Sequence, residues 1–180
     1  MSAVYPKLPK VNDVAIESKF LSTDEHSVLL SWAEDEFSHG RLKTNPSGPF
    51  RYFNRYEKGD SVPDVFWEVR QRTISNFSIT DYEDEPKFRC FLGCNTEGGF
   101  VGRHTDSAPP DKHHIRMNIM VSKPLRGGIP FVNGKTIDIE ERDMWCFFPA
   151  IMPHASSPVL GNRNRFVLSI GILVPRNSVP

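Results

Sequence analysis

The chain has 180 residues, a length typical of one domain, and we expect residues 1–180 to form a single domain. Its 22 Lys and Arg balance 22 Asp and Glu, so the net charge is zero. Without a basic excess, neither a nucleic-acid partner nor a polybasic membrane contact is expected. A chain of this length buries enough surface to fold without a disulfide or a structural metal.

The cysteines and the N-terminal stretch indicate a cytoplasmic protein. Residues 1–10 contain no apolar stretch of the kind found in secretory signals, and no run approaches the roughly 18 apolar residues of a membrane-spanning helix. Cys90, Cys94 and Cys146 are few and odd in number, which is typical of reduced thiols. Cys90 and Cys94 are expected to pack in the core, with a zinc pair as the alternative.

Two helices are predicted in the first half of the chain. Ser22 and Glu25 form a capping-box pattern, and apolar residues follow at helical spacing up to Gly40, a natural stop. A second helix is predicted to start near Asp64. Its expected buried stripe consists of Phe66, Val69, Thr73, Ile74 and Phe77. Between the helices we expect a turn at 44–49 and a strand or an ordered loop at 50–56.

From residue 87 onward the apolar residues recur with period two, which predicts strands. The expected strands cover 88–93, 115–122, 144–148 and 165–174. Residues 131–137 predict a hairpin, because Asn133 and Gly134 suit a type I′ turn. The fold class is therefore mainly β with flanking helices. The helical part covers about 20–80, and a sandwich or barrel covers about 86–174.

One histidine stands out from the six in the chain. His26 and His39 are expected on the surface of the first helix, and His113 and His114 in a loop. His104 is followed two residues later by Asp106. On a strand these two side chains share a face, roughly 6.6–6.8 Å apart, and can converge on one metal ion. A surface His-Thr-Asp turn is the alternative for the isolated motif.

A third ligand and an arginine follow at informative spacing. His154, 50 residues after His104, completes a set of two histidines and one carboxylate, which suits iron(II) with three adjacent open positions. Arg165 opens the last alternating strand, where its guanidinium can bind a carboxylate through two hydrogen bonds. A salt-bridged strand-edge residue is the alternative for Arg165. Arg163, near the same spacing, is expected in an exposed turn.

The order His104, Asp106, His154, Arg165 resembles the iron(II)/2-oxoglutarate-dependent oxygenase superfamily. The matching segments are 102–107, 153–161 and 165–171. Residues 114–119 further resemble the aspartyl/asparaginyl β-hydroxylase-like and small amino-acid hydroxylase members. Some relatives carry a serine two residues after the arginine, where this chain has Val167.

This resemblance implies a double-stranded β-helix with Fe(II) held by His104, Asp106 and His154. It implies 2-oxoglutarate as co-substrate, with Arg165 on its 5-carboxylate, dioxygen as oxidant, and ascorbate as a reductant in vitro. Halogenating members lack the carboxylate ligand, so Asp106 favours hydroxylation or another oxidation without halide. Such an enzyme would oxidise an unactivated C–H of a small molecule or an amino-acid side chain and release succinate and CO2.

Arg116 and Asn118 share one face of their strand and are candidates for contacting the co-substrate or the substrate. A solvated outer face is the alternative for this pair. Two other functions also stay open: a metal-binding cupin-type protein without 2-oxoglutarate chemistry, and a catalytically silent binding module.

Overall fold

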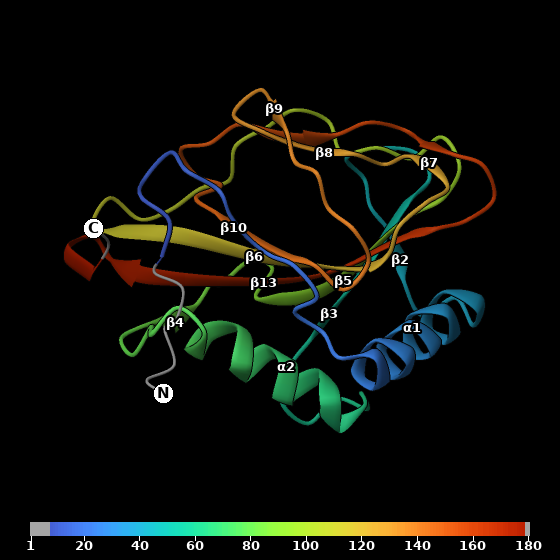
Figure 1. Ribbon diagram of the computed structural model, residues 1–180, viewed down its shortest axis with the longest axis horizontal. Helices are drawn as coiled ribbons and strands as arrows, with labels where there is room; N and C mark the ends of the chain where they lie inside the picture. Colours follow the sequence, from blue (N-terminus) through green and yellow to red (C-terminus); the bar gives the residue numbers. More distant parts are fainter. Residues whose placement is uncertain (1–7, 179–180) are drawn as a thin grey trace.

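The computed structural model describes residues 8–178 and arranges them in three layers. Helices α1 and α2 lie under one large sheet, and short strands cover the other face (Figure 1). Residues 1–7, on which part of the expectation about secretion rests, lie outside the described range. The elements are β1 Ala15–Glu17, α1 Thr23–Ser38, β2 Lys43–Thr44, β3 Arg51–Tyr56, α2 Asp64–Ser75, β4 Glu83–Asp84, β5 Cys90–Asn95, β6 Lys112–Ser122, β7 Arg126–Gly127, β8 Pro130–Val132, β9 Lys135–Thr136, β10 Met144–Phe147, β11 His154–Ser156, β12 Val159–Leu160, β13 Arg165–Pro175 and the 3₁₀ turn Arg176–Ser178.

Helix α1 begins at the predicted capping box. The Ser22 hydroxyl accepts from the Glu25 N–H at 3.2 Å, and the Glu25 carboxylate accepts from the Ser22 N–H at 2.8 Å. These two bonds satisfy N–H groups that a helix start otherwise leaves unpaired. Beyond the last helical turn Gly40 has a φ of 67°, a left-handed value that glycine adopts at little cost. The predicted boundaries of the first helix are thus confirmed.

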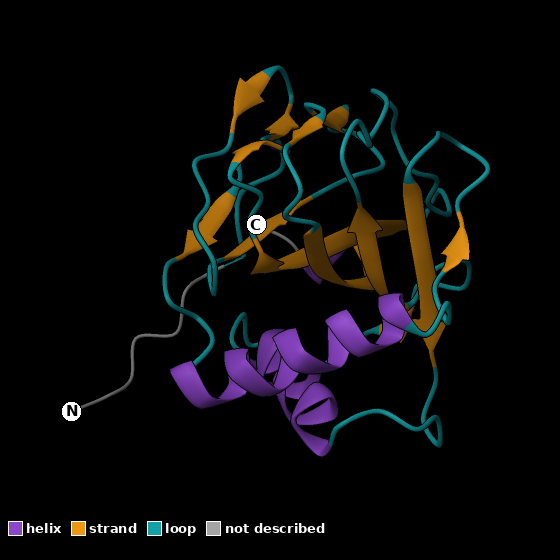
Figure 2. Cartoon of the chain, turned by 90° about the vertical axis from the view of Figure 1, so that its right-hand side faces the viewer, coloured by secondary structure: helices purple, strands orange, loops and turns teal. Residues whose placement is uncertain are grey.

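Figure 2 shows the two helices along one face of the strands, and the predicted stripe of α2 is buried. Phe66, Val69, Thr73 and Ile74 are all buried within it. Phe77 is also buried but lies just past the end of the helix. The two helices therefore supply the hydrophobic layer that covers one face of the sheet. No helix within residues 8–178 combines the length and apolar character needed to span a membrane.

The large sheet is antiparallel, with strand order β1-β10-β6-β13-β5-β3-β2, and β4 adds to β13. Two smaller sheets, β11-β8-β9 and β12-β7, lie opposite it. Residues 50–56 contain β3, so the strand alternative holds there. The predicted hairpin is β8–β9, with φ of 51° at Asn133 and 77° at Gly134, as a type I′ turn requires. The fold class, mainly β with two flanking helices, is confirmed.

Strand β13 is buried on both faces because it has a layer on each side. Phe166 faces the helices, with its ring centroid 6.3 Å from that of Phe37. Arg165, Val167 and Ser169 alternate with it and line a cavity on the opposite face. The free thiols of Cys90, Cys94 and Cys146 are buried, as expected for core residues.

Three local predictions were wrong. His113 and His114 belong to β6, where they pair with Val174 and Leu173 of β13, because the turn after Pro109 closes at Lys112 and the ladder starts at once. His26 is half-buried because its Nε2 bonds the Val121 carbonyl at 2.8 Å. The strand expected from residue 88 starts at Cys90. A turn precedes it, in which the Glu85 carboxylate accepts from the N–H groups of residues 87 and 88.

Candidate active site

A cavity of about 630 Å³ is lined by residues of the large sheet and of the short strands that face it. On the large-sheet side of the cavity, the lining side chains change from charged to apolar along the strands. One rung brings together Arg51, Asn95 and Arg165 on β3, β5 and β13. The next rung holds Phe53 and Val167 on either side of Gly93. These two rungs give the cavity a cationic end and an apolar middle.

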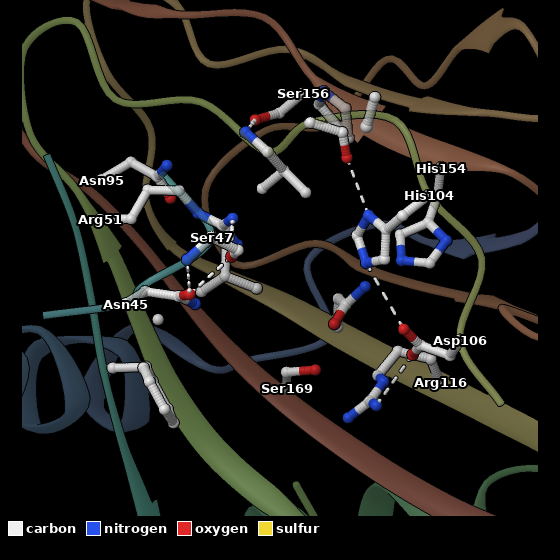
Figure 3. Close-up of a pocket in the computed structure, with 18 of the residues that line it drawn as sticks. Asn45, Ser47, Arg51, Asn95, His104, Asp106, Arg116, His154, Ser156 and Ser169 are labelled. Carbon is white, nitrogen blue, oxygen red and sulfur yellow. Dashed lines mark hydrogen bonds and ion pairs between the residues drawn. The ribbon is translucent and has the colours of Figure 1, made fainter. Parts of the chain in front are cut away.

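His104 and His154 meet through the backbone. They form an isolated antiparallel bridge, with N–H···O distances of 3.1 Å and 2.9 Å in the two directions. Directly opposed residues on antiparallel strands carry their side chains close together. The two ring centroids accordingly lie 4.2 Å apart (Figure 3). Residues 50 positions apart in the sequence are thus neighbours in the fold.

Backbone carbonyls orient both imidazole rings. His104 Nδ1 donates to the Gly102 carbonyl at 2.8 Å, and His154 Nδ1 donates to the Met152 carbonyl at 3.2 Å. A carbonyl only accepts, so Nδ1 carries a proton in both rings. Hydrogen bonds of this kind orient metal-binding histidines. In each histidine Nε2 is therefore the ring nitrogen left to bind a metal.

Asp106 completes the cluster. One of its oxygens lies 3.4 Å from His104 Nε2, and the other accepts from Arg116 Nη2 at 3.1 Å. One ligand atom from each of His104, Asp106 and His154 falls within 4.8 Å of the others, the one such cluster found in residues 8–178. The predicted ligand set is thus brought together in space.

The pKa values of Asp106 and His154 also suit a cation. Burial alone would raise the pKa of Asp106, but the bond from His104 and the charge of Arg116 outweigh it and hold the pKa well below its usual range. Burial lowers the pKa of His154 to about 4. The hydrogen bond to Asp106 raises the pKa of His104. Near neutral pH the cluster thus contains a carboxylate and a neutral His154.

Arg165 lies at the cationic end and is almost completely buried, with 6% of its surface exposed. No carboxylate within residues 8–178 pairs with it, and its Nε has no hydrogen-bond partner. Burial, reinforced by the nearby charge of Arg51, lowers the pKa of Arg165 to about 10. The Nδ2 of neighbouring Asn95 is likewise buried without a partner. A buried cation without an anion is costly, so this end of the cavity suits an anionic ligand.

The other predicted residues occupy distinct places. Arg163 is exposed and pairs with Glu141 away from the cavity, so the predicted exposed turn is found. Arg116 and Asn118 are buried and line the cavity, which excludes the alternative of a solvated outer face. Arg116 also lies 3.7 Å from Glu85, and its Nη1 has no partner in the described part of the chain. Whether Arg116 and Asn118 bind the co-substrate stays a prediction.

Sequence reasoning missed three residues of this site. Arg51 and Asn95 join Arg165 only through strand register, for which no short motif exists. His114 is buried and its Nδ1 lies 3.9 Å from Asp106, although the preceding Pro109 and Pro110 favoured a loop there. The alternation that puts Arg116 and Asn118 on one face, continued two residues toward the N-terminus, would have placed His114 on the same face.

The donors present fit both groups that the resemblance implies. Two imidazole nitrogens and one carboxylate oxygen on one side of an open cavity form the facial set typical of iron(II) oxygenases. The unpaired Arg165 at the other end fits a carboxylate. The cavity thus offers a metal site and an anion site together.

No family model matches the chain, and no curated protein matches it in sequence. Solved structures do match. A Trichoplax adhaerens prolyl hydroxylase, solved with a hypoxia-inducible-factor peptide, aligns with a TM-score of 0.73 and 14% identity over 92% of this chain and 85% of that one. The collagen prolyl hydroxylase of Paramecium bursaria Chlorella virus-1, a 2-oxoglutarate complex, aligns with a TM-score of 0.68 and 15% identity over 91% and 96%. The non-heme α-ketoglutarate-dependent epimerase SnoN of nogalamycin biosynthesis aligns with a TM-score of 0.67 and 10% identity over 90% and 77%. At these identities the likeness establishes the fold: the chain has the double-stranded β-helix of the iron(II)/2-oxoglutarate-dependent oxygenases.

Proposed function

We propose that the protein is an iron(II)- and 2-oxoglutarate-dependent dioxygenase that hydroxylates a small molecule or an amino-acid side chain. One observation carries the proposal: a two-histidine, one-carboxylate cluster and an unpaired buried arginine occupy a single cavity. Either feature alone also occurs in proteins that are not oxygenases. Their combination matches the needs of a co-substrate that chelates a metal at one end and has a carboxylate at the other.

In this proposal His104, Asp106 and His154 hold Fe(II), and Arg165 binds the 5-carboxylate of 2-oxoglutarate. When bound, these two groups supply the oxidation, in which dioxygen gives one oxygen atom to succinate and the other to the substrate, with release of CO2. The protein orients the side chains that would bind the metal. Nδ1 donation fixes the histidine rings, and Arg116 fixes the Asp106 carboxylate.

The walls of the cavity support the same function. Trp145 and Phe147 are buried on the strand beside Arg116 and line the cavity. Apolar walls lower the local dielectric and restrict water around the reacting groups. The proposed substrate class stays broad, and a peptide is within it. The Trichoplax adhaerens prolyl hydroxylase, which shares the fold, was solved with a peptide fragment.

The test is an anaerobic titration of the protein with Fe(II) and then with 2-oxoglutarate, followed by visible absorption. We expect one Fe(II) per chain and a weak charge-transfer band when 2-oxoglutarate is added. Admission of dioxygen with ascorbate should then release succinate. Metal uptake without the band would instead favour a cupin-type protein without 2-oxoglutarate chemistry. Absence of metal uptake would favour a silent binding module.

A further inference from the structure

Arg51 is a second arginine at the cationic end of the cavity. It opens β3 in the same rung as Asn95 and Arg165 and lines the cavity. Its side chain is half-buried, and this burial lowers its pKa. No carboxylate within residues 8–178 forms an ion pair with it. Two arginines thus share one end of the cavity without an acid.

Ser47 and Asn45 hold the Arg51 guanidinium in place. Its Nη1 donates to the Ser47 hydroxyl at 2.8 Å (Figure 3). That hydroxyl and the Ser47 N–H in turn donate to Asn45 Oδ1, at 2.5 Å and 2.9 Å. Because only Nη1 takes part in this network, the other guanidinium donors have no partner within residues 8–178 and can bind a ligand. A group oriented in advance loses less entropy when it binds.

Charge balance separates the role of Arg51 from that of Arg165. In the proposed complex, Fe(II), Arg116 and Arg165 carry four positive charges. Asp106, Glu85 and the two carboxylates of 2-oxoglutarate supply the four negative charges that balance them. Arg51 is then left as one uncompensated positive charge in a partly desolvated site. Lys87 and Arg103 also line the cavity, but both are exposed, so water and salt screen their charges. A single negative charge on another ligand would satisfy Arg51.

An apolar wall lies next to Arg51. Phe53 is two residues further along β3 and lines the same cavity, so both side chains share a face of the strand. The ring of Phe91 lies 6.4 Å from that of Phe53, in an edge-to-face pair. Both rings are only half-buried. A ligand bound to Arg51 through an anion can therefore place an apolar body against these rings.

We propose that the substrate of this site is a small carboxylic acid with an apolar body, whose carboxylate is bound by Arg51 and whose body packs against Phe53 and Phe91. This inference rests on the proposed function and adds the substrate class to it. A monoanionic carboxylate is favoured over a phosphate because only one positive charge is left to balance. Arg51 is accordingly a specificity-determining residue rather than a co-substrate ligand.

The test measures binding without turnover. The protein is loaded with Mn(II), which is paramagnetic, and with 2-oxoglutarate under argon. The probes are 3-phenylpropionate, hexanoate, their primary amides and inorganic phosphate, and the readout is the Mn(II)-induced relaxation of their NMR signals, with ³¹P for phosphate. We expect relaxation of the two acids at least tenfold above that of their amides and of phosphate.

Variants assign this binding to Arg51. Arg51→Gln should weaken acid binding by about tenfold or more, since a charge-assisted pair is lost. The matched control is Arg55→Gln on the same strand, because Arg55 is exposed, bonds the Lys87 carbonyl and does not line the cavity. Both variants should keep the wild-type circular dichroism and 2-oxoglutarate affinity. Equal relaxation by acids and amides, stronger relaxation of phosphate, or full acid binding in Arg51→Gln would overturn the inference.

The same samples separate this inference from the proposed function. Loss of 2-oxoglutarate affinity in Arg51→Gln would assign Arg51 to the co-substrate, which overturns the inference and leaves the dioxygenase intact. Failure of 2-oxoglutarate to bind the Mn(II)-loaded wild type would overturn both.

Discussion

Arg116 Nη2 donates to Asp106 Oδ2 at 3.1 Å, so a buried cation fixes the carboxylate of the candidate metal cluster. Arg116 itself is balanced by Glu85 at 3.7 Å. Its guanidinium occupies the space above Gly171, where an added Cβ would lie 2.8 Å from Nη1. Gly171 on β13 thus leaves space for the Arg116 guanidinium, and Glu85 balances its charge, so both support the contact with Asp106.

The first prediction concerns this arginine. Arg116→Gln should lower the affinity for Mn(II) or Fe(II) by about 10–100-fold, as for other groups that orient a metal ligand. Isothermal titration with Mn(II) measures this, with Arg55→Gln as a control of equal charge change away from the cavity. A metal affinity within a factor of two of the wild type would show that Asp106 needs no such support.

The second prediction concerns the histidines. His104→Ala and His154→Ala should each abolish stoichiometric Fe(II) uptake and the charge-transfer band, because two ligands hold the ion far less well than three. His39→Ala, in an exposed position beyond α1, should leave both unchanged. Fe(II) uptake is measured by anaerobic titration. One equivalent of tightly bound Fe(II) in either cluster variant would place the metal elsewhere.

Local chemistry explains why much of the fold was predictable. The capping box at Ser22 and the turn at Asn133 act within four residues, and their geometry depends little on the rest of the chain. The spacing of His104 and Asp106 is equally local. His154 was predictable for another reason. The order of His-x-Asp, a distant histidine and an arginine resembles the pattern of the iron(II)/2-oxoglutarate-dependent oxygenases.

Register and burial explain what was not predictable. Arg51 meets Arg165 only because β5 lies between β3 and β13 with Asn95 opposite both residues. A shift of one residue in either pairing would move Arg51 to the helix-covered face. The bond between Arg116 and Asp106 likewise joins a strand to a loop. The alternation of residues showed that Arg116 and Asn118 share a face of the sheet, but not whether that face lines a cavity or contacts solvent.

The third prediction links the helices to pH. The hydrogen bond from Arg72 of α2 is the main cause that lowers the pKa of Glu25 in α1, from 4.5 to about 2. A carboxylate with a lowered folded-state pKa stabilises the fold above pH 4.5, and this stability is lost as the pH falls through 2. Glu25→Gln should therefore cost about 1 kcal/mol or less at pH 7 and nothing near pH 2.

Urea unfolding of the wild type and of Glu25→Gln at several pH values checks this. The exposed Glu34 on the same helix gives the control Glu34→Gln, which should follow the wild type throughout. A difference between Glu25→Gln and the wild type that stays constant from pH 7 to pH 2 would contradict a stabilising ion pair with Arg72.

The fourth prediction distinguishes two arginines that are close in the sequence. Arg165 is buried in the cavity without a partner, and removing one member of a buried charge pair costs about 2–5 kcal/mol. At 1.4 kcal/mol for each tenfold, Arg165→Ala should weaken 2-oxoglutarate binding by roughly 30-fold or more. Arg163 forms an exposed pair with Glu141, worth about 0–1 kcal/mol, so Arg163→Ala should change that affinity by less than about fivefold. Titration of 2-oxoglutarate into the Mn(II)-loaded variants measures both, and a large loss in Arg163→Ala alone would mean that the co-substrate binds outside the cavity.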